Sequence, residues 1–171
     1  MKQLSIFDKN SEICEPDSTV SKENHWTLFV DGAARNNPGP AGAGVCILKN
    51  NALFLKKGFF LGIRTNNQAE YLALLLGLFF LEKQLREGDA LEIFSDSQLL
   101  VRQLKREYKV KHRDLIPLHA AARSFLQDKQ YTVRHVMREH NTVADALANQ
   151  GVELGRKNIP DDFEHFCLRY R

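Results

Sequence analysis

One apolar run dominates the middle of this chain and limits the folds open to it. After the polar stretch RTNNQAE, residues 71–81 read YLALLLGLFFL without a charged side chain. This pattern predicts a helix from about Gln68 to Glu87 that is built to be buried by other elements. The run is too short to span a bilayer and is bounded by Glu70, Glu82 and Lys83. We therefore expect a globular domain and no membrane insertion.

Length and composition fit one domain with tails. The chain has 171 residues, of which 43% are hydrophobic and 26% charged, ordinary values for a protein with a sizeable core. The cysteines are odd in number, without metal-ligand spacing, and favour free thiols in a reducing compartment. The N-terminus lacks the basic-then-apolar order of a signal peptide. We expect a cytoplasmic monomer. The cysteines are Cys14, Cys46 and Cys167.

Turn residues and short apolar runs divide the chain into strands and helices. Strands are expected at 26–32, 45–48, 52–60, 91–96 and 131–137. Helices are expected at 68–87, from Ser97 through Leu104, at 115–127 and at 142–154. Between the first two strands, AARNNPGPAGAG predicts a turn-rich connection. The order βββαβααβα predicts an α/β fold, a mixed sheet with an antiparallel hairpin portion and helices packed on it.

The two ends of the chain differ from this middle portion. Residues 1–24 are polar, contain Pro16 and show little periodicity, which predicts a disordered N-terminal tail. The folded domain is expected at 25–154. Residues 155–171 are expected to form a C-terminal tail of balanced charge, in which Phe163, Phe166 and Tyr170 are able to dock on the domain.

Four acidic side chains lie where the expected elements begin or end. Asp31 and Asp96 end two strands, Glu70 lies at the start of the buried helix, and Asp145 lies in the first turn of the last helix. Each alone is also explained as a turn residue, a cap or a partner of a helix dipole. If the four converge, cations must offset their repulsion. Carboxylate oxygens select hard ions such as Mg²⁺ or Mn²⁺.

Basic residues gather in the stretch from Arg102 to Arg138. This stretch holds ten lysines and arginines against three acidic residues, an excess of seven positive charges, although the whole chain carries only +3. Such a stripe is typical of a phosphate-binding surface, and it is equally explained as a solvated helix face.

Four motifs make the sequence resemble a known family. FVDGAARNNPGPAGAG, TNNQAE, IFSDSQ and REHNTVADALA occur in the order and spacing of type 1 ribonuclease H, over about residues 25–152. The resemblance implies a ribonuclease H-like fold, a five-stranded mixed sheet whose first three strands are antiparallel. It also implies an endonuclease that hydrolyses the RNA strand of RNA–DNA hybrids.

The resemblance assigns chemistry to the four acids. Asp31, Glu70, Asp96 and Asp145 match the family's catalytic, metal-binding carboxylates, which implies two Mg²⁺ or Mn²⁺ ions per active site. In such chemistry one ion activates water and the other stabilises the leaving 3′-oxygen. The products would carry 5′-phosphate and 3′-hydroxyl ends.

The resemblance also assigns the amides around the buried helix to the substrate. The positions that match contacts to minor-groove edges and sugars of the hybrid carry side chains able to donate and accept hydrogen bonds. Thr65 matches a position that binds a phosphate of the DNA strand. The amide positions are Asn37, Asn66, Asn67 and Gln98.

The chain departs from many type 1 enzymes in two places. The loop that carries a catalytic histidine is shortened between Met137 and Asp145, so His140 is a candidate stand-in and Arg138 a candidate auxiliary residue. The basic protrusion is also missing. Both features resemble the compact branch of the family. Phosphate contacts are then expected from Lys105, Arg106, Lys109, Lys111 and Arg113.

Other functions remain open at this point. A non-catalytic hybrid-binding module of the same fold would be favoured by the loss of a carboxylate, and none of the four is lost. A proofreading exonuclease wants an acid two residues after the first aspartate, where this chain has Ala33. Transposases lack the NPGP and TNN elements. These comparisons favour the hydrolase.

The N-terminal tail carries a second, weaker signal. QLSIF resembles the short peptide by which bacterial replication and repair proteins dock on the sliding clamp. Such a segment orders on binding, and its apolar side chains fill a pocket. The alternative is an ordinary disordered start without a partner. The residues concerned are Gln3, Leu4, Ile6 and Phe7.

Overall fold

A five-stranded mixed sheet forms the centre of the protein. The computed structural model describes residues 23–171, and the sheet order is β3-β2-β1-β4-β5. β1 pairs antiparallel with β2, which pairs antiparallel with β3, while β1, β4 and β5 are parallel. The predicted ribonuclease H-like sheet is therefore confirmed. The strands are β1 (His25–Ala34), β2 (Gly39–Lys49), β3 (Ala52–Arg64), β4 (Ala90–Ser95) and β5 (Gln130–His135).

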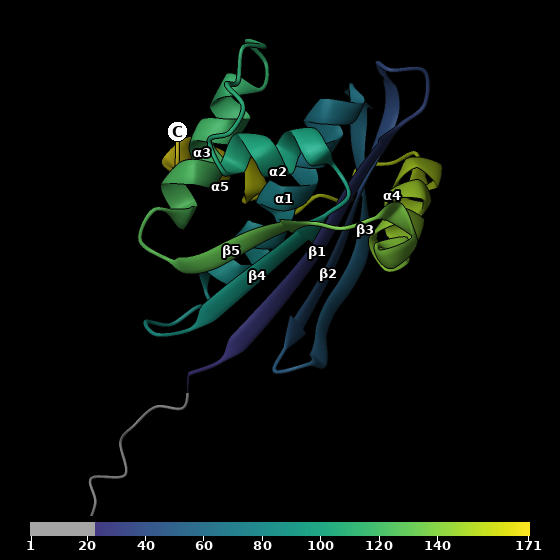
Figure 1. Ribbon diagram of the computed structural model, residues 1–171. Coiled ribbons are helices and arrows are strands. Elements are labelled where there is room, and N and C mark those ends of the chain that lie inside the picture. The colour runs from purple at the N-terminus through teal and green to yellow at the C-terminus, as the bar shows by residue number, and fades with distance from the viewer. Residues whose placement is uncertain (1–22) are drawn as a thin grey trace, which may run out of the picture.

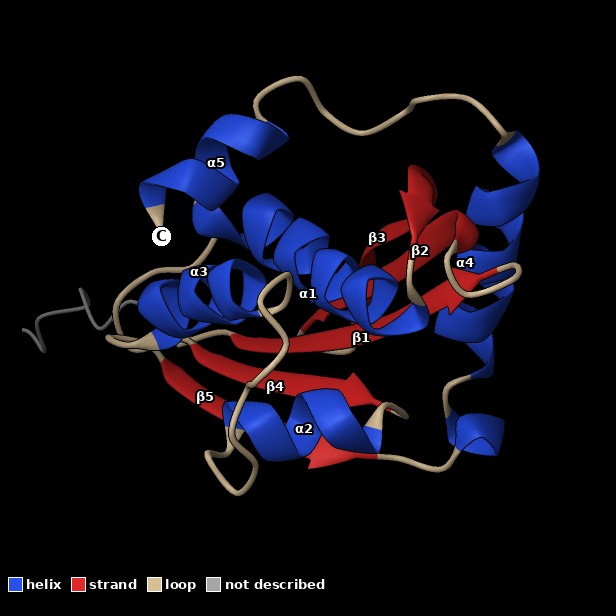
Figure 2. Ribbon diagram, turned by 90° about the horizontal axis from the view of Figure 1, so that it is seen from above, coloured by secondary structure: helices blue, strands red, loops and turns tan. Residues whose placement is uncertain are grey.

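Helices cover both faces of the sheet. Figure 1 shows α1, α2, α3 and α5 gathered on one side and α4 alone on the other, and Figure 2 shows the same arrangement from above. No helix within residues 23–171 is long and apolar enough to cross a membrane. The helices are α1 (Asn66–Glu82), α2 (Gln98–Leu104), α3 (Ile116–Leu126), α4 (Thr142–Leu154) and α5 (Phe163–Arg169), with a 3₁₀ turn η1 (Arg138–His140) before α4.

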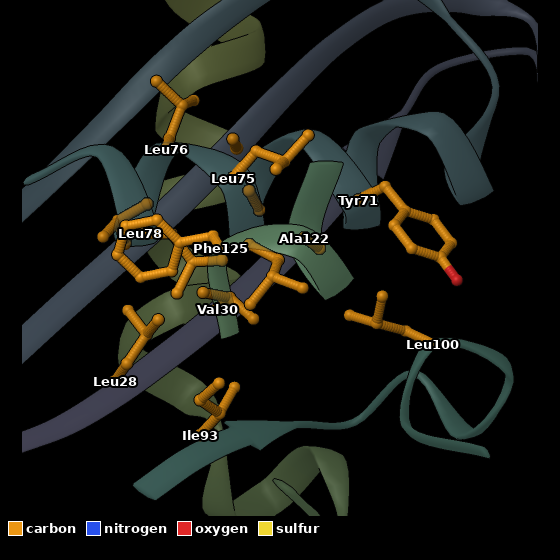
Figure 3. Close-up of a cluster of buried hydrophobic side chains, with 14 of the residues drawn as sticks. Leu28, Val30, Tyr71, Leu75, Leu76, Leu78, Ile93, Leu100, Ala122 and Phe125 are labelled. Carbon is orange, nitrogen blue, oxygen red and sulfur yellow. The ribbon is translucent and has the colours of Figure 1, made fainter. Parts of the chain in front are cut away.

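The apolar run of the sequence is the central helix α1. Its residues from Ala73 to Leu76 are fully buried, and they pack between the sheet and the outer helix α3. Leu28 and Val30 of β1 and Ile93 of β4 supply the sheet side of this core, which Figure 3 shows in close-up. Burial of this helix on all sides confirms the expectation from its composition.

The stretch predicted to be turn-rich is largely a strand, which corrects the expectation of a strand only from Val45. β2 begins at Gly39, and β1 continues to Ala34. Glycines are needed here because α4 crosses the sheet in backbone contact. A Cβ at Gly44 would lie 2.0 Å from the carbonyl oxygen of Ala144. Gly42 and Gly44, which suggested turns, instead form part of the surface on which α4 packs.

The segment after α4 adds a second apolar contact to the domain. In α5, Phe166 is fully buried, and its ring lies 5.6 Å from Phe79 of α1 and 5.7 Å from Phe125 of α3. Arg169 and Tyr170 both donate hydrogen bonds to the Glu82 carboxylate, at 2.8 and 2.9 Å. The aromatic residues of this segment therefore dock on α1 and α3 through a short helix that the sequence did not predict.

Candidate active site

Two strand ends bring the first pair of acids together. β1 and β4 are parallel neighbours in which Val30 lies opposite Ser95, so the residues that follow, Asp31 and Asp96, are adjacent. Asp31 pairs with Gly44 of β2, the glycine on which α4 packs, so it lies on the face that carries α4. Asp31 and Asp96 share this face with Phe29 and Phe94, two residues earlier on each strand, whose rings stack at 5.0 Å. Ser97 caps α2 by accepting from the Leu100 N–H at 3.3 Å. The cap of α2 therefore does not use Asp96.

Glu70 reaches the same place from the opposite face of the sheet. Gly32 makes this approach feasible, because a Cβ there would lie 2.2 Å from the backbone nitrogen of Glu70. α1 begins at Asn66, earlier than predicted, with Thr65 as its N-cap. Glu70 therefore lies beyond the first turn, and a role as a partner of the helix dipole does not account for it.

The three carboxylates form one cluster. Asp31, Glu70 and Asp96 each offer an oxygen atom within 4.8 Å of the others. Burial, together with the charges of Asp96 and Asp145, raises the pKa of Asp31 to about 7. Burial also raises the pKa of Glu70 well above its usual range, and the charges of Asp31 and Asp96 add to the shift. The site thus brings together carboxyl groups whose ionised forms are disfavoured by burial and by one another.

Asp145 lies beside this cluster and has a different partner. Its Oδ1 accepts hydrogen bonds from both Nε, at 3.1 Å, and Nη2 of Arg138. Its charge contributes to the raised pKa of Asp31. Asp145 lies in the first turn of α4, which packs on Gly44. The structure therefore brings three of the four predicted carboxylates together and leaves the fourth adjacent, paired with an arginine.

Asn141 is a site residue that sequence reasoning missed. It is buried, with 2% of its surface exposed, and its Nδ2 donates to the Val30 carbonyl at 3.0 Å and to Asp96 Oδ1 at 3.1 Å. The start of α4 is thereby tied to the β1 strand and to one carboxylate of the cluster. The position of Asn141 directly before α4 is typical of a helix cap, yet this residue makes no side-chain cap hydrogen bond.

The amides predicted to touch substrate are partly used within the fold. Asn66 Oδ1 accepts from the Ala34 N–H, and Asn37 Oδ1 accepts from the Asn66 N–H, both at 2.8 Å. Thr65 Oγ1 accepts from the Gln68 N–H in a capping box. These bonds fix the β1–β2 connection to the start of α1. The Nδ2 groups of Asn37 and Asn66 make no hydrogen bond within residues 23–171, and both residues are exposed, as are Asn67 and Gln98.

The two candidate auxiliary residues lie on η1. Arg138 lines the cavity at the carboxylates. His140 is exposed, lies 3.9 Å from Glu139 and is not among the residues that line that cavity in the described part of the chain. His135, the other histidine nearby, contacts the backbone oxygen of Asp96 at 3.1 Å.

The basic stripe divides into two groups. Arg134 pairs with Glu92 at 3.2 Å, and Arg123 donates to the Leu104 carbonyl at 3.0 Å, so both serve the fold. The connection between α2 and α3 carries five basic side chains that are all exposed, as expected for phosphate contacts. These are Lys105, Arg106, Lys109, Lys111 and Arg113.

The carboxylates suit a divalent cation. The Oε2 atom of Glu70 is shielded from solvent and has no hydrogen-bond partner in the described structure, which is costly for a carboxylate unless a cation meets it. The cluster opens into a cavity of about 390 Å³ that Arg35 and Asn66 also line. An all-oxygen donor set of this kind fits Mg²⁺ or Mn²⁺.

Two sequence comparisons relate this chain to known proteins. Residues 29–151 match the family model described as reverse transcriptase-like. A bifunctional protein of Mycobacterium tuberculosis is 35% identical over 138 residues, 79% of this chain and 37% of that protein. The chain therefore spans little more than a third of the mycobacterial protein.

Solved structures give the same result. The crystal structure of ribonuclease H1 from Halobacterium salinarum matches with a TM-score of 0.70 and 34% identity, over 75% of this chain and 98% of that one. LC11-RNase H1, crystallised in complex with an RNA/DNA hybrid, matches with a TM-score of 0.71 and 33% identity, over 76% of this chain and 98% of that one. On its fold, its carboxylate cluster and these relatives, the chain belongs to the type 1 ribonuclease H family.

Proposed function

We propose that this protein is an endoribonuclease that hydrolyses the RNA strand of RNA–DNA hybrids and leaves 5′-phosphate and 3′-hydroxyl ends. The observation that carries the proposal is the cluster in which Asp31, Glu70 and Asp96, from three different elements, bring carboxylate oxygens within 4.8 Å. Three buried or half-buried acids at this distance destabilise a fold without a cation. The hybrid bound in the crystal structure of LC11-RNase H1 supports the choice of substrate.

The carboxylates would hold two Mg²⁺ or Mn²⁺ ions. When bound, such ions supply an activated water and offset the charge that develops on the leaving 3′-oxygen. Asp31 and Asp96, adjacent at their strand ends, would contribute to both ions, and Glu70 and Asp145 to one each. The shielded Oε2 of Glu70 is available for this role. In the reaction, the water gives up a proton as its oxygen bonds to phosphorus, the P–O3′ bond breaks, and the leaving 3′-oxygen takes up a proton.

The exposed amides would position the hybrid. Because the side-chain oxygens of Asn37 and Asn66 are engaged within the fold, these two residues present N–H donors to the substrate. Donors suit the acceptor atoms of minor-groove base edges and the 2′-hydroxyl of the RNA strand. The Thr65 hydroxyl accepts the capping bond and is still able to donate to a DNA phosphate. Asn67 and Gln98 extend this surface.

A cleavage assay tests the proposal. Labelled RNA–DNA hybrid, double-stranded RNA and single-stranded RNA are incubated with the purified protein in Mg²⁺ or Mn²⁺, and product ends are mapped. We expect the hybrid to be cut in its RNA strand, with 5′-phosphate ends, and Asp96→Asn to abolish the cleavage. Asp96 is half-buried at the end of β4, and the isosteric change removes its charge with little change in shape.

The same assay separates the enzyme from a binding module. A protein that retains hybrid in a gel-shift experiment but cuts nothing in either metal would be the non-catalytic module, and the proposal would then be wrong. Cleavage that persists in Asp96→Asn would place the chemistry outside this cluster. Binding should weaken steeply with salt, because exposed lysines and arginines in the α2–α3 connection contact phosphates.

We also propose that the N-terminal peptide docks on a replication sliding clamp, which would place the enzyme in the cytoplasm beside DNA synthesis. The peptide, residues 3–7, lies outside the described residues. The motif QLSIF is the support for this proposal. Deletion of residues 1–7 should abolish co-purification with the clamp while cleavage of hybrid stays unchanged. Unaltered co-purification of the shortened protein would refute the docking.

A further inference from the structure

Asp145 differs from the other three acids because, within residues 23–171, it alone forms an ion pair, with Arg138. Both hydrogen bonds from the Arg138 guanidinium go to the same oxygen, Oδ1 of Asp145. The Arg138 side chain is 75% exposed, and that of Asp145 is 27% exposed. Arg138 also lines the cavity into which Asp31, Glu70 and Asp96 open. The guanidinium therefore takes up space in this cavity and engages lone pairs of Asp145 Oδ1. A cation bound by all four acids would need both.

Arg138 is also the cation that the structure supplies to this acidic site. Among residues 23–171 it is the one basic side chain found in an ion pair with any of the four acids. Apart from Asp145, no hydrogen-bond partner of its guanidinium is found in that range. A side chain that is exposed and held at one point is able to leave without disturbing the core.

We propose that Arg138 is a positioning residue that holds Asp145 in the metal-free protein and competes with a divalent ion for it. The inference rests on the proposed metal site. An ion that takes Oδ1 of Asp145 as a ligand must displace the two hydrogen bonds on that oxygen, and an ion at Oδ2 must share the carboxylate with the guanidinium, so the apparent affinity for the ion is lower than the carboxylates alone would give. Exposed ion pairs are weak, and the effect expected on the dissociation constant is roughly two- to fivefold.

The test is calorimetric titration of Mn²⁺ into the nucleic-acid-free protein. Arg138→Gln should bind Mn²⁺ roughly two- to fivefold more tightly than the wild type. Arg35→Gln is the matched control, because Arg35 lines the same cavity and makes no ion pair within residues 23–171. It removes one positive charge from the cavity without freeing Asp145, so its gain in affinity should be smaller. Circular dichroism during heating checks that each variant is folded.

A double-mutant cycle separates competition from general electrostatics. In an Asp145→Asn background, Arg138→Gln should tighten Mn²⁺ binding no more than Arg35→Gln does, because the contested ligand is gone and only the loss of one positive charge remains. The proposal is overturned if Arg138→Gln leaves affinity unchanged or weakens it, if Arg35→Gln gives the same gain, or if the full gain persists in Asp145→Asn. A wild-type protein that binds no Mn²⁺ at all would refute the metal site itself. Tight Mn²⁺ binding with the same affinity in the wild type and in Arg138→Gln would refute only the competition.

Discussion

The raised pKa of Asp31 predicts that the metal-free protein loses stability as the solution becomes more basic. Its pKa moves from an ordinary 3.8 to about 7. Between these values the folded protein keeps a proton that the unfolded chain has released, so the free energy of unfolding falls as pH rises. Because Asp31 is 5% exposed, solvent screening reduces the effect little. The full shift corresponds to about 4 kcal/mol, of which about 2–3 kcal/mol falls between pH 5 and pH 8.

Urea unfolding in a metal chelator, at pH 5 and at pH 8, measures this loss. The reference is Asp31→Asn, which cannot release the proton and should lose roughly 2–3 kcal/mol less over the same interval. Glu70, whose pKa is also raised by burial and partly by the charge of Asp31, is present in both proteins, and its dependence on Asp31 adds to the difference in the same direction. The pKa of His119 is lowered by burial, so its contribution to stability rises with pH. This contribution is the same in both proteins and is removed when their stabilities are compared. Asp89 has a lowered pKa and is ionised in both states over this range.

The second half of this prediction concerns the stability of the protein in saturating Mg²⁺. An ion that binds the ionised carboxylates stabilises the folded state more at pH 8 than at pH 5, because at the lower pH it must displace protons. The wild type should recover most of its lost stability, and Asp31→Asn should recover less. Equal pH dependence in the chelated wild type and in Asp31→Asn would refute the reasoning, since it would mean that burial does not hold a proton on Asp31.

Three further substitutions test how the fold positions the site. Gly44→Ala places a methyl group against the α4 backbone and should cost about 1–3 kcal/mol in urea unfolding and reduce hybrid cleavage; unchanged stability would contradict the close packing of α4. Phe166→Ala should cost about 3–5 kcal/mol, whereas the exposed Leu168→Ala should stay within about 0.5 kcal/mol; equal costs would show that α5 does not add to the core. Asn141→Ala leaves a carboxylate without its donor and should lower the single-turnover cleavage rate more than hybrid affinity, and an unchanged rate would contradict a positioning role.

The sequence was informative where a feature depends on neighbours along the chain. The apolar run of α1 predicted its burial, and the acids at two strand ends raised the hypothesis of convergent carboxylates, which the parallel pairing of β1 and β4 makes true for Asp31 and Asp96. The sequence was misleading where a residue is explained by contacts with an element that is distant along the chain. Gly44 lies in a stretch whose composition is typical of turns, but it is a strand residue whose missing side chain lets the backbone at Ala144 of α4 pack closely. The reason for a glycine at this position is a contact with a helix about a hundred residues later in the sequence.

The amides at the start of α1 show the same limit in a functional setting. A single cap needs one polar residue, and the resemblance to type 1 ribonuclease H assigned the additional amides to the substrate. In the structure Gln68 completes the capping box with Thr65, and the oxygens of Asn37 and Asn66 hold the β1–β2 connection against the helix. The fold thus uses the acceptor half of each amide and leaves the donor half exposed. One set of residues therefore holds the start of the helix that carries Glu70 and, in the proposed function, would present donors to the hybrid, so truncating any of these amides should change both stability and binding.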